Sequence, residues 1–185
     1  MGKARSAGPM ELVTTVQLRD GREARIRRAT PEDAESITDF VNLIGSERRF
    51  VLRERATWSL DEERATLAAA AGNEGAFFVA EIAGRISGLL NVARGRWSKD
   101  THLAEFGMSC RADSRGVGLG SALLTAGIEW AQSVGVQKLT LEVFATNESA
   151  IALYRKMGFV EEARLRGQYV IDGQRVDSIL MARWF

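Results

Sequence analysis

Hydrophobic and polar positions near the start of the chain predict a hairpin followed by a helix. Weak alternation over Leu12–Leu18 meets Asp20-Gly21, a strong hairpin signal, before a second run at Glu23–Arg28. Thr30-Pro31-Glu32-Asp33 supplies an N-cap, an N1 proline and the acidic first turn of a helix. The buried stripe that follows is Ile37, Phe40, Val41 and Ile44.

The rest of the chain continues to switch between the strand period and the helix period. A second helix opens at Ser59 and stops near Gly72. The later elements are, in order, a hairpin of 76–82 with 86–93, a strand at 102–110, a helix from Leu119, a strand at 138–144, a helix at 147–157 and a hairpin of 160–171 with 175–184. This order predicts an α/β domain in which helices flank a mixed sheet.

The most informative motif is Arg115-Gly116-Val117-Gly118-Leu119-Gly120, which leads directly into an apolar helix. A helix N-terminus exposes unpaired N–H groups and the positive end of the helix dipole, and glycines let an anion approach them closely. The spacing differs from the Gly-x-Gly-x-x-Gly of dinucleotide folds. It also differs from a P-loop, because no Lys-Ser/Thr follows the last glycine. We therefore expect a phosphate site for a ligand other than NAD or ATP.

A second motif runs from Asn147 to Phe159. Its apolar positions follow helical spacing and carry Tyr154 on the inward face, in the set Ala150, Leu153, Tyr154 and Met157. A phenol in a cleft can donate a proton to a departing thiolate. The alternative interpretation is a core tyrosine bonded to a carbonyl.

Composition agrees with a single globular domain. The 185 residues include 45% apolar and 26% charged residues, and a net charge of +1 gives no global attraction to nucleic acid or to an anionic membrane. No apolar run approaches the roughly 18 residues of a membrane span, so we expect a cytoplasmic protein. Residues 1–11 are expected to be a disordered leader or a cloning remnant, which leaves 12–185 as the domain.

Metal chemistry is not expected from this sequence. His102 is the only histidine and Cys110 the only cysteine. Zinc sites combine several such ligands, so a metal centre is disfavoured. A lone cysteine also forms no internal disulfide.

Together, the two motifs resemble those of the GNAT superfamily of acyl-CoA-dependent N-acetyltransferases, and the resemblance extends from about Arg25 to the C-terminus. Arg115-x-x-Gly118-x-Gly120 is similar to the pyrophosphate loop of that family, and Asn147 to Phe159 to its second signature. The resemblance implies a splayed, mostly antiparallel sheet flanked by helices. It also implies that a bulge opens this sheet between the fourth and fifth strands, where an unpaired edge holds pantetheine.

The same resemblance assigns a binding site for acetyl-CoA as the acyl donor. It implies that the amides of Met108 and Cys110 hold the pantetheine arm and that Asn147 holds the arm from the other side. The residues around the diphosphate would be Arg115, Gly116, Val117, Gly118, Gly120 and Ser121. Cys110 stands where the family usually has a small apolar residue, so we expect a packed thiol rather than a nucleophile.

The implied chemistry is direct attack of an amine on the thioester, with Tyr154 as the acid. The amine must first lose a proton, and two carboxylates compete for that role. Glu105 resembles the glutamate base of GNAT histone acetyltransferases and is favoured, whereas Glu142 matches the glutamate of the ribosomal-protein alanine acetyltransferases. His102 or a chain of waters is a further alternative, and either glutamate can instead be a strand-end carboxylate that is exposed or paired with arginine.

The acceptor is expected to be the primary amine of an amino acid or another small molecule. The segments 102–108 and 173–183 resemble the bacterial L-amino acid N-acetyltransferase branch. The pattern from Leu141 to Asn147 resembles the ribosomal branch instead, which acetylates protein N-termini. A non-catalytic acyl-CoA sensor is the alternative of another class. We expect no nucleic acid or membrane partner, and a homodimer is possible.

Four further features are expected near the acceptor or on the surface. In relatives, the segments that contain Phe50, Trp58 and Trp97 line the acceptor side, so these rings either shape the amine pocket or close the core. The basic cluster Arg48, Arg49, Arg53 and Arg55 is expected to be a solvated face, with an acidic ligand as the alternative.

Overall fold

The computed structural model describes residues 13–52 and 54–185; the expected leader at 1–11 lies outside them. The strands are β1 (Thr14–Gln17), β2 (Glu23–Arg28), β3 (Gly75–Ile82), β4 (Arg85–Arg94), β5 (Leu103–Cys110), β6 (Lys138–Phe144), β7 (Val160–Ile171) and β8 (Gln174–Trp184). The helices are α1 (Ala34–Ser46), α2 (Leu60–Ala69), α3 (Leu119–Ser133) and α4 (Glu148–Lys156), with short 3-10 turns at Pro31–Asp33 and Ala112–Ser114. Every element predicted from the hydrophobic pattern is confirmed.

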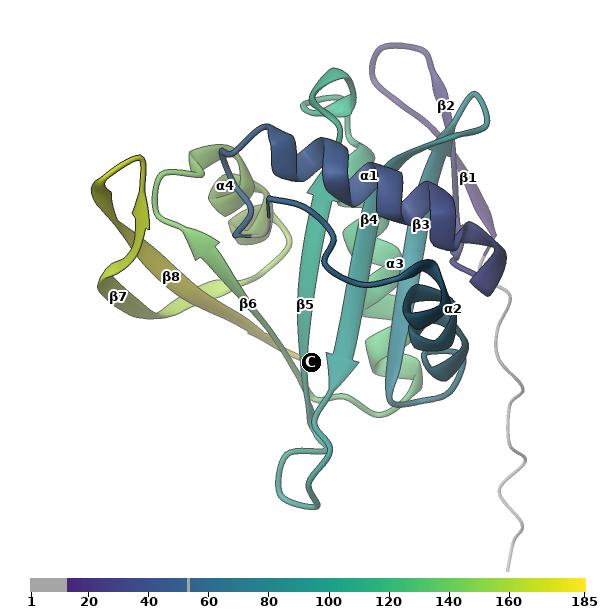
Figure 1. Cartoon of the computed structure of the whole chain (residues 1–185). Coiled ribbons are helices and arrows are strands. Elements are labelled where there is room, and N and C mark those ends of the chain that lie inside the picture. Colours follow the sequence, from purple (N-terminus) through teal and green to yellow (C-terminus); the bar gives the residue numbers. More distant parts are fainter. Residues whose placement is uncertain (1–12, 53) are drawn as a thin grey trace, which may run out of the picture.

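The strands form one eight-stranded sheet in the order β1-β2-β3-β4-β5-β6-β8-β7. All neighbours are antiparallel except β5 and β6, which run parallel. That parallel pairing covers only Leu103–Glu105 against Lys138–Thr140, after which the two strands diverge and leave the sheet open. Figure 1 shows this opening as a wedge between β5 and β6, with α4 near its wide end.

The opening separates the strand of Glu105 from the strand of Glu142, as expected; with the N-terminal hairpin counted, these are the fifth and sixth strands. It differs from the expectation in one respect. No bulge interrupts the pairing of β5 with β4, which continues from Arg94↔Ala104 to Gly88↔Cys110. The sheet therefore opens where β6 leaves β5, and β5 itself stays regular.

Helices cover both faces of the sheet. In Figure 1, α1 crosses the front of β3 and β4, α2 lies in front beside β3, and α3 lies behind the same strands. Two apolar clusters result: α3 and α4 pack with the sheet in the larger one, and α1 and α2 pack against Val79 and Ile86 in the smaller one. The larger cluster buries the rear side chains of β5, Ala104 and Phe106, whereas none of the described β5 residues belongs to the smaller cluster in front.

Local sequence signals explain how the helices begin. Ser59 caps α2 in a reciprocal arrangement with Glu62, whose backbone N–H donates to the Ser59 hydroxyl at 3.3 Å. Pro31 follows the N-cap Thr30 as predicted, although the first turn is a 3-10 turn and the α-helix starts at Ala34. Arg27 ties this turn to the sheet through ion pairs with Asp33 and Glu81.

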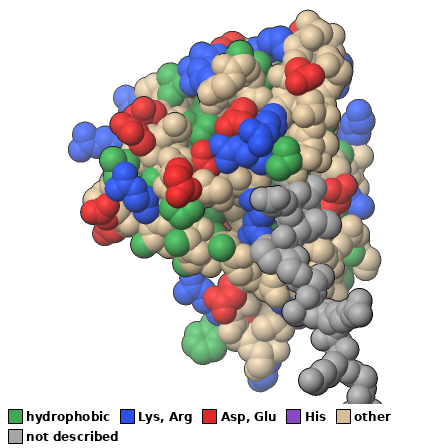
Figure 2. All heavy atoms as spheres, turned by 90° about the vertical axis from the view of Figure 1, so that its right-hand side faces the viewer, with side chains coloured by type: hydrophobic (Ala, Val, Ile, Leu, Met, Phe, Trp, Pro, Cys, Tyr) green, Lys and Arg blue, Asp and Glu red, His purple; other side chains and the backbone are tan. Residues whose placement is uncertain are grey.

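The surface carries mixed charges. On the face shown in Figure 2, acidic and basic side chains are interspersed and hydrophobic side chains are scattered among them. No helix within the described residues is long and apolar enough to cross a membrane.

Candidate active site

The glycine loop presents a row of free backbone donors. Gly116 and Gly118 have φ values of +74° and +102°, and Gly118 is the N-cap of α3. Such φ values are strained for any residue with a Cβ. Within the described residues, the first N–H of this segment with a partner is that of Ala122, which bonds the Gly118 carbonyl at 3.2 Å. The amides of residues 116–121 therefore remain available for a ligand.

The edge of β5 presents further donors. Arg111 N–H bonds the Ser87 carbonyl, and Gly95 N–H bonds the Leu103 carbonyl, so the odd-numbered residues of β5 pair with β4. Because hydrogen bonds alternate along an antiparallel ladder, Met108 and Cys110 direct their N–H groups away from β4. Both residues lie beyond the last pair with β6, so these amides face the opening of the sheet.

A cavity of about 430 Å³ joins the loop, the β5 edge and α4. Most of the residues proposed to bind the cofactor line it: Met108, Cys110, Arg115, Gly116, Gly118, Gly120, Ser121 and Asn147. Val117 is the exception, since its side chain packs on the core and its carbonyl accepts the Arg19 N–H at 3.0 Å. Asn147 caps α4 through its side-chain oxygen, which accepts the Ala150 N–H at 3.3 Å.

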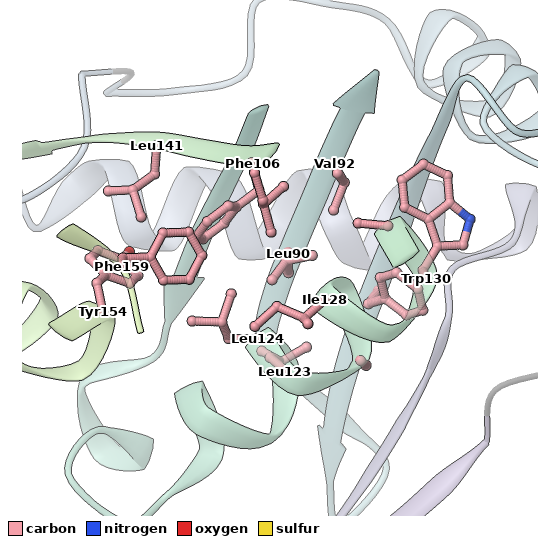
Figure 3. Packing of buried hydrophobic residues seen from close by; sticks show 14 of the residues in the cluster. Leu90, Val92, Phe106, Leu123, Leu124, Ile128, Trp130, Leu141, Tyr154 and Phe159 are labelled. Carbon is pink, nitrogen blue, oxygen red and sulfur yellow. The ribbon is translucent and has the colours of Figure 1, made fainter. Parts of the chain in front are cut away.

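Tyr154 also lines this cavity. Its side chain is 6% exposed and packs edge-on against Phe106 and Phe159, as Figure 3 shows. No group in the described part of the chain forms a hydrogen bond with its hydroxyl. Burial raises the pKa of Tyr154 well above its usual value, and the nearby Cys110 adds to the shift. The phenol therefore stays protonated and able to donate.

The stripe predicted around Tyr154 needs one correction. The residue of α4 that is buried beside Tyr154 is Ile151, whereas Ala150 and Leu153 are partly buried and line the cavity. The predicted stripe does pack against the core, and Ile151 is added to it; the Ala150 edge of the stripe also borders the cavity. Tyr154 both packs in the core and lines the cavity.

Cys110 is a packed thiol, as expected. Burial raises its pKa to about 12, although Arg115 acts in the opposite direction. A thiol with this pKa is almost entirely neutral near pH 7, so it is a poor nucleophile.

Charged residues around the cavity include several that the sequence motifs do not reveal. Arg115 bonds the Cys110 carbonyl at 2.9 Å and pairs with Glu47 at 2.6 Å, so it braces the loop against the end of α1. Arg19 and Lys156 also line the cavity. Arg19 comes from the β1–β2 turn, almost a hundred positions earlier, and no local signal connects that turn to the glycine loop.

The two candidate bases lie outside this cavity, at the point where β5 and β6 separate. Glu105 is the last β5 residue paired with β6, and Glu142 lies two residues beyond its partner Thr140. Both side chains are exposed, and neither pairs with an arginine within the described residues. Glu142 accepts a hydrogen bond from the Tyr169 hydroxyl at 2.8 Å, whereas the Glu105 carboxylate has no hydrogen-bond partner in that part of the chain.

Tyr169 of β7 was missed by sequence reasoning. Burial, the hydrogen bond to Glu142 and the charges of Glu142 and Glu105 together raise the pKa of its phenol. Both carboxylates are thus close enough to influence one hydroxyl. In the sequence, Tyr169 is visible only as an aromatic residue close to the Asp172-Gly173 turn. That position does not reveal which neighbouring strand its hydroxyl contacts.

Of the aromatic and basic residues noted in the sequence, those that the structure describes lie in different parts of it and do not form one site. Phe50 lines the cavity of the glycine loop, Trp58 lines a second cavity, and Trp97 is 77% exposed and lines neither. Arg48 pairs with Glu54 at 3.2 Å, and Arg49 stacks on Phe50. Arg53 lies outside the described residues.

Three curated relatives are similar to this chain. The N-alpha-acetyltransferase of Sulfurisphaera tokodaii is 30% identical over 90% of this chain and 96% of its own length. The [ribosomal protein bS18]-alanine N-acetyltransferase of Escherichia coli is 42% identical over 42% of this chain, a match that spans about half (52%) of that relative. L-amino acid N-acetyltransferase AaaT of Escherichia coli is 32% identical over 57% of this chain and 65% of its own length.

Solved structures share the fold. A GNAT-family acetyltransferase from Streptococcus pneumoniae matches with a TM-score of 0.84 and 29% identity, covering 88% of this chain and 99% of its own. YncA of Salmonella typhimurium, solved with its cofactor acetyl-CoA, matches with a TM-score of 0.78 and 23% identity over 87% of this chain and 93% of its own. The family model described as Acetyltransferase (GNAT) family matches residues 38–159, which include the glycine loop, the β5 edge and Tyr154. The chain therefore belongs to the GNAT acetyltransferase family.

Proposed function

We propose that this protein transfers the acetyl group of acetyl-CoA to a primary amine, by direct attack within a ternary complex. The observation that carries the proposal is the run of unpaired amides at 116–121, beside a cavity that is lined both by this loop and by Tyr154. A diphosphate bonds well to such amides at a helix N-terminus. A relative of the same fold was solved with acetyl-CoA, which supports the choice of ligand.

The cofactor is proposed to lie along the cavity with its charged end at the loop. Arg19, Arg115 and Lys156 border this space and complement the negative phosphates. The amides of Met108 and Cys110 then pair with the pantetheine arm as an added strand would. This arrangement brings the thioester close to Tyr154.

The amine attacks the thioester carbonyl, so that a C–N bond forms and the C–S bond breaks. We assign the removal of the amine proton to Glu105, since its carboxylate is exposed and free of hydrogen-bond partners within the described residues. Glu142 is the second candidate, but the Tyr169 hydroxyl already occupies one of its oxygens. Tyr154 donates its proton to the leaving sulfur.

Calorimetry tests the cofactor. Acetyl-CoA is expected to bind in the micromolar range, while NAD and ATP bind much more weakly, because the loop lacks their binding patterns. Saturation by NAD or ATP without heat from CoA would overturn the proposal.

The acceptor is proposed to be an amino acid or another small amine. A protein N-terminus is the second candidate, because the Sulfurisphaera relative named for that activity aligns with 90% of this chain. A screen of acetyl-CoA consumption across amino acids, polyamines and peptide N-termini separates the two. Consumption with none of these amines would favour a non-catalytic acyl-CoA sensor.

A further inference from the structure

A second cavity lies on the front of the sheet, between α1, α2 and strands β3 to β5. It measures about 460 Å³ and shares Ile44, Val51 and Ser109 with the cavity of the glycine loop. Ser109 stands between Met108 and Cys110, the two residues whose amides face the opening. The two cavities therefore meet where the proposed thioester would lie.

The lining of this second cavity is mostly apolar and aromatic. The apolar members contributed by helices and strands are Ile37, Phe40, Val41, Ile44, Phe77 and Leu89, and Trp58 adds an indole. Glu63 is the only ionisable group among the described lining residues; it is 6% exposed and already interacts with another residue. A cavity of this volume and character suits one apolar side chain or ring.

The floor of the cavity leads toward the proposed base. Glu105, Gly107 and Ser109 alternate along β5 and so share the front face of the sheet. The Asn91 side chain lies against Gly107, since its Oδ1 is 2.9 Å from the place a Cβ would occupy there. Because Gly107 has no side chain, it leaves room for the Asn91 carboxamide between Ser109 and Glu105.

Asn91 supplies hydrogen-bonding capacity at this midpoint. It lines the second cavity, and no other group in 13–52 or 54–185 forms a hydrogen bond with its carboxamide. Along the floor, an apolar pocket is followed by a carboxamide and then a carboxylate. An α-amino acid unit carries three groups on its Cα that complement these: a side chain for the pocket, a carbonyl for the carboxamide and an amine for the carboxylate.

Resting on the function proposed above, we propose that the second cavity receives the side chain of the acceptor. The preferred acceptor is then the α-amino group of an aromatic or long aliphatic residue, with Asn91 bonded to its carbonyl oxygen. Burial of such a side chain raises kcat/KM roughly tenfold to hundredfold over glycine. An acidic side chain is rejected, because it would lose its hydration beside the Glu63 carboxylate.

A series of amino acid amides tests this specificity, because it keeps the amine constant and varies the side chain. At saturating acetyl-CoA, kcat/KM is expected to rise from glycinamide through leucinamide to phenylalaninamide, and to be lowest for the α-amide of aspartic acid. Equal or higher values for glycinamide or for the aspartic acid amide would overturn the inference.

Filling the cavity gives a second, independent test. Val41→Trp is expected to lower kcat/KM for phenylalaninamide by roughly tenfold or more and to leave glycinamide within about twofold. The matched control is Leu43→Trp on the same helix, where the side chain is 38% exposed and does not line the cavity. A loss of activity that is equal for both amides, or equal in both variants, would contradict the proposal; if Val41→Trp fails to fold, the wild-type series decides.

Asn91→Leu probes the hydrogen bond separately. We expect KM for phenylalaninamide to rise roughly tenfold, with acetyl-CoA binding unchanged. Calorimetry with acetyl-CoA distinguishes the two levels of inference. Absence of acetyl-CoA binding contradicts the proposed function, whereas binding and turnover with a preference for small amines contradicts only the role of the cavity.

Discussion

The proposed site has a donor end, which would bind acetyl-CoA, and an acceptor end, which would bind the amine. The two ends differ in the groups that provide their polar contacts. At the donor end, the contacts proposed for the diphosphate come from main-chain amides of one continuous segment, 116–121, and two glycines set their direction. At the acceptor end, the proposed polar contacts come from side chains: Glu105 from β5, Glu142 from β6, Tyr169 from β7 and Asn91 from β4. The amides proposed to hold the diphosphate are local in sequence, whereas the acceptor side chains come from four strands.

This difference has a functional consequence. A main-chain site tolerates most side-chain changes and therefore suits a ligand that stays the same, such as a diphosphate. A side-chain site changes with each substitution and therefore suits a ligand that varies between relatives. We accordingly expect substitutions at the two ends to change different kinetic quantities.

The largest effect is expected at Tyr154, where the two ends meet. Tyr154→Phe removes the proposed acid and is expected to lower kcat roughly tenfold to thousandfold, with acetyl-CoA binding within about twofold of wild type. Steady-state kinetics and calorimetry measure the two quantities. Tyr169→Phe is the matched control; it should change the KM for the amine more than kcat. Unchanged turnover in Tyr154→Phe would remove this residue from the chemistry.

The reactivity of the Cys110 thiol tests whether this residue at the donor end is a packed, neutral thiol rather than a nucleophile. The pKa of about 12 favours the neutral thiol, so the thiolate fraction stays small until the pH approaches that value. At pH 8, alkylation by iodoacetamide is expected to be roughly a thousandfold slower than that of an ordinary cysteine, because the thiolate fraction is lower by about that factor. Mass spectrometry over time, with a model cysteine peptide as reference, gives the rate. Alkylation as fast as that of the peptide would refute the raised pKa.

Gly118→Val tests whether the conformation of the glycine loop is needed for acetyl-CoA binding. It places a branched side chain at a φ of +102°. The strain distorts the amides and is expected to weaken acetyl-CoA binding roughly tenfold to hundredfold. Gly84→Val is the control, because Gly84 also has a positive φ of +75° but lies in the β3–β4 turn, outside the cavity. Equal binding by both variants would contradict the role of the loop.

The smallest effect separates the two glutamates at the acceptor end. Deprotonation of the amine makes the rate rise with pH, and removal of the base should flatten that rise. Both variants are compared at neutral pH. The rate of Glu105→Gln is expected to be lower than that of Glu142→Gln by a factor of several to about ten. pH–rate profiles of both variants give the comparison. A larger effect of Glu142→Gln would transfer the role of base to that residue.

The same contrast explains what could be predicted from the sequence. Strand and helix periods and capping signals depend on neighbouring residues, so the elements were predicted correctly, including the position of the glycine loop at the start of α3. Arg19, Asn91 and Tyr169 were not found, because their roles depend on which strands lie side by side. The predicted bulge was wrong for a related reason: the sheet opens because β6 turns away after Thr140, and nothing in the sequence of β5 marks that event.

The central claim is that free main-chain donors at 116–121 bind the diphosphate of CoA. The most direct test is a titration followed through backbone amide resonances, with CoA and with pantetheine, which lacks the diphosphate. We expect CoA to shift the amides of Gly116, Gly118 and Gly120 strongly, and pantetheine to shift mainly those of Met108 and Cys110. Equal responses of the three glycines to both ligands, or no response to CoA, would contradict the account.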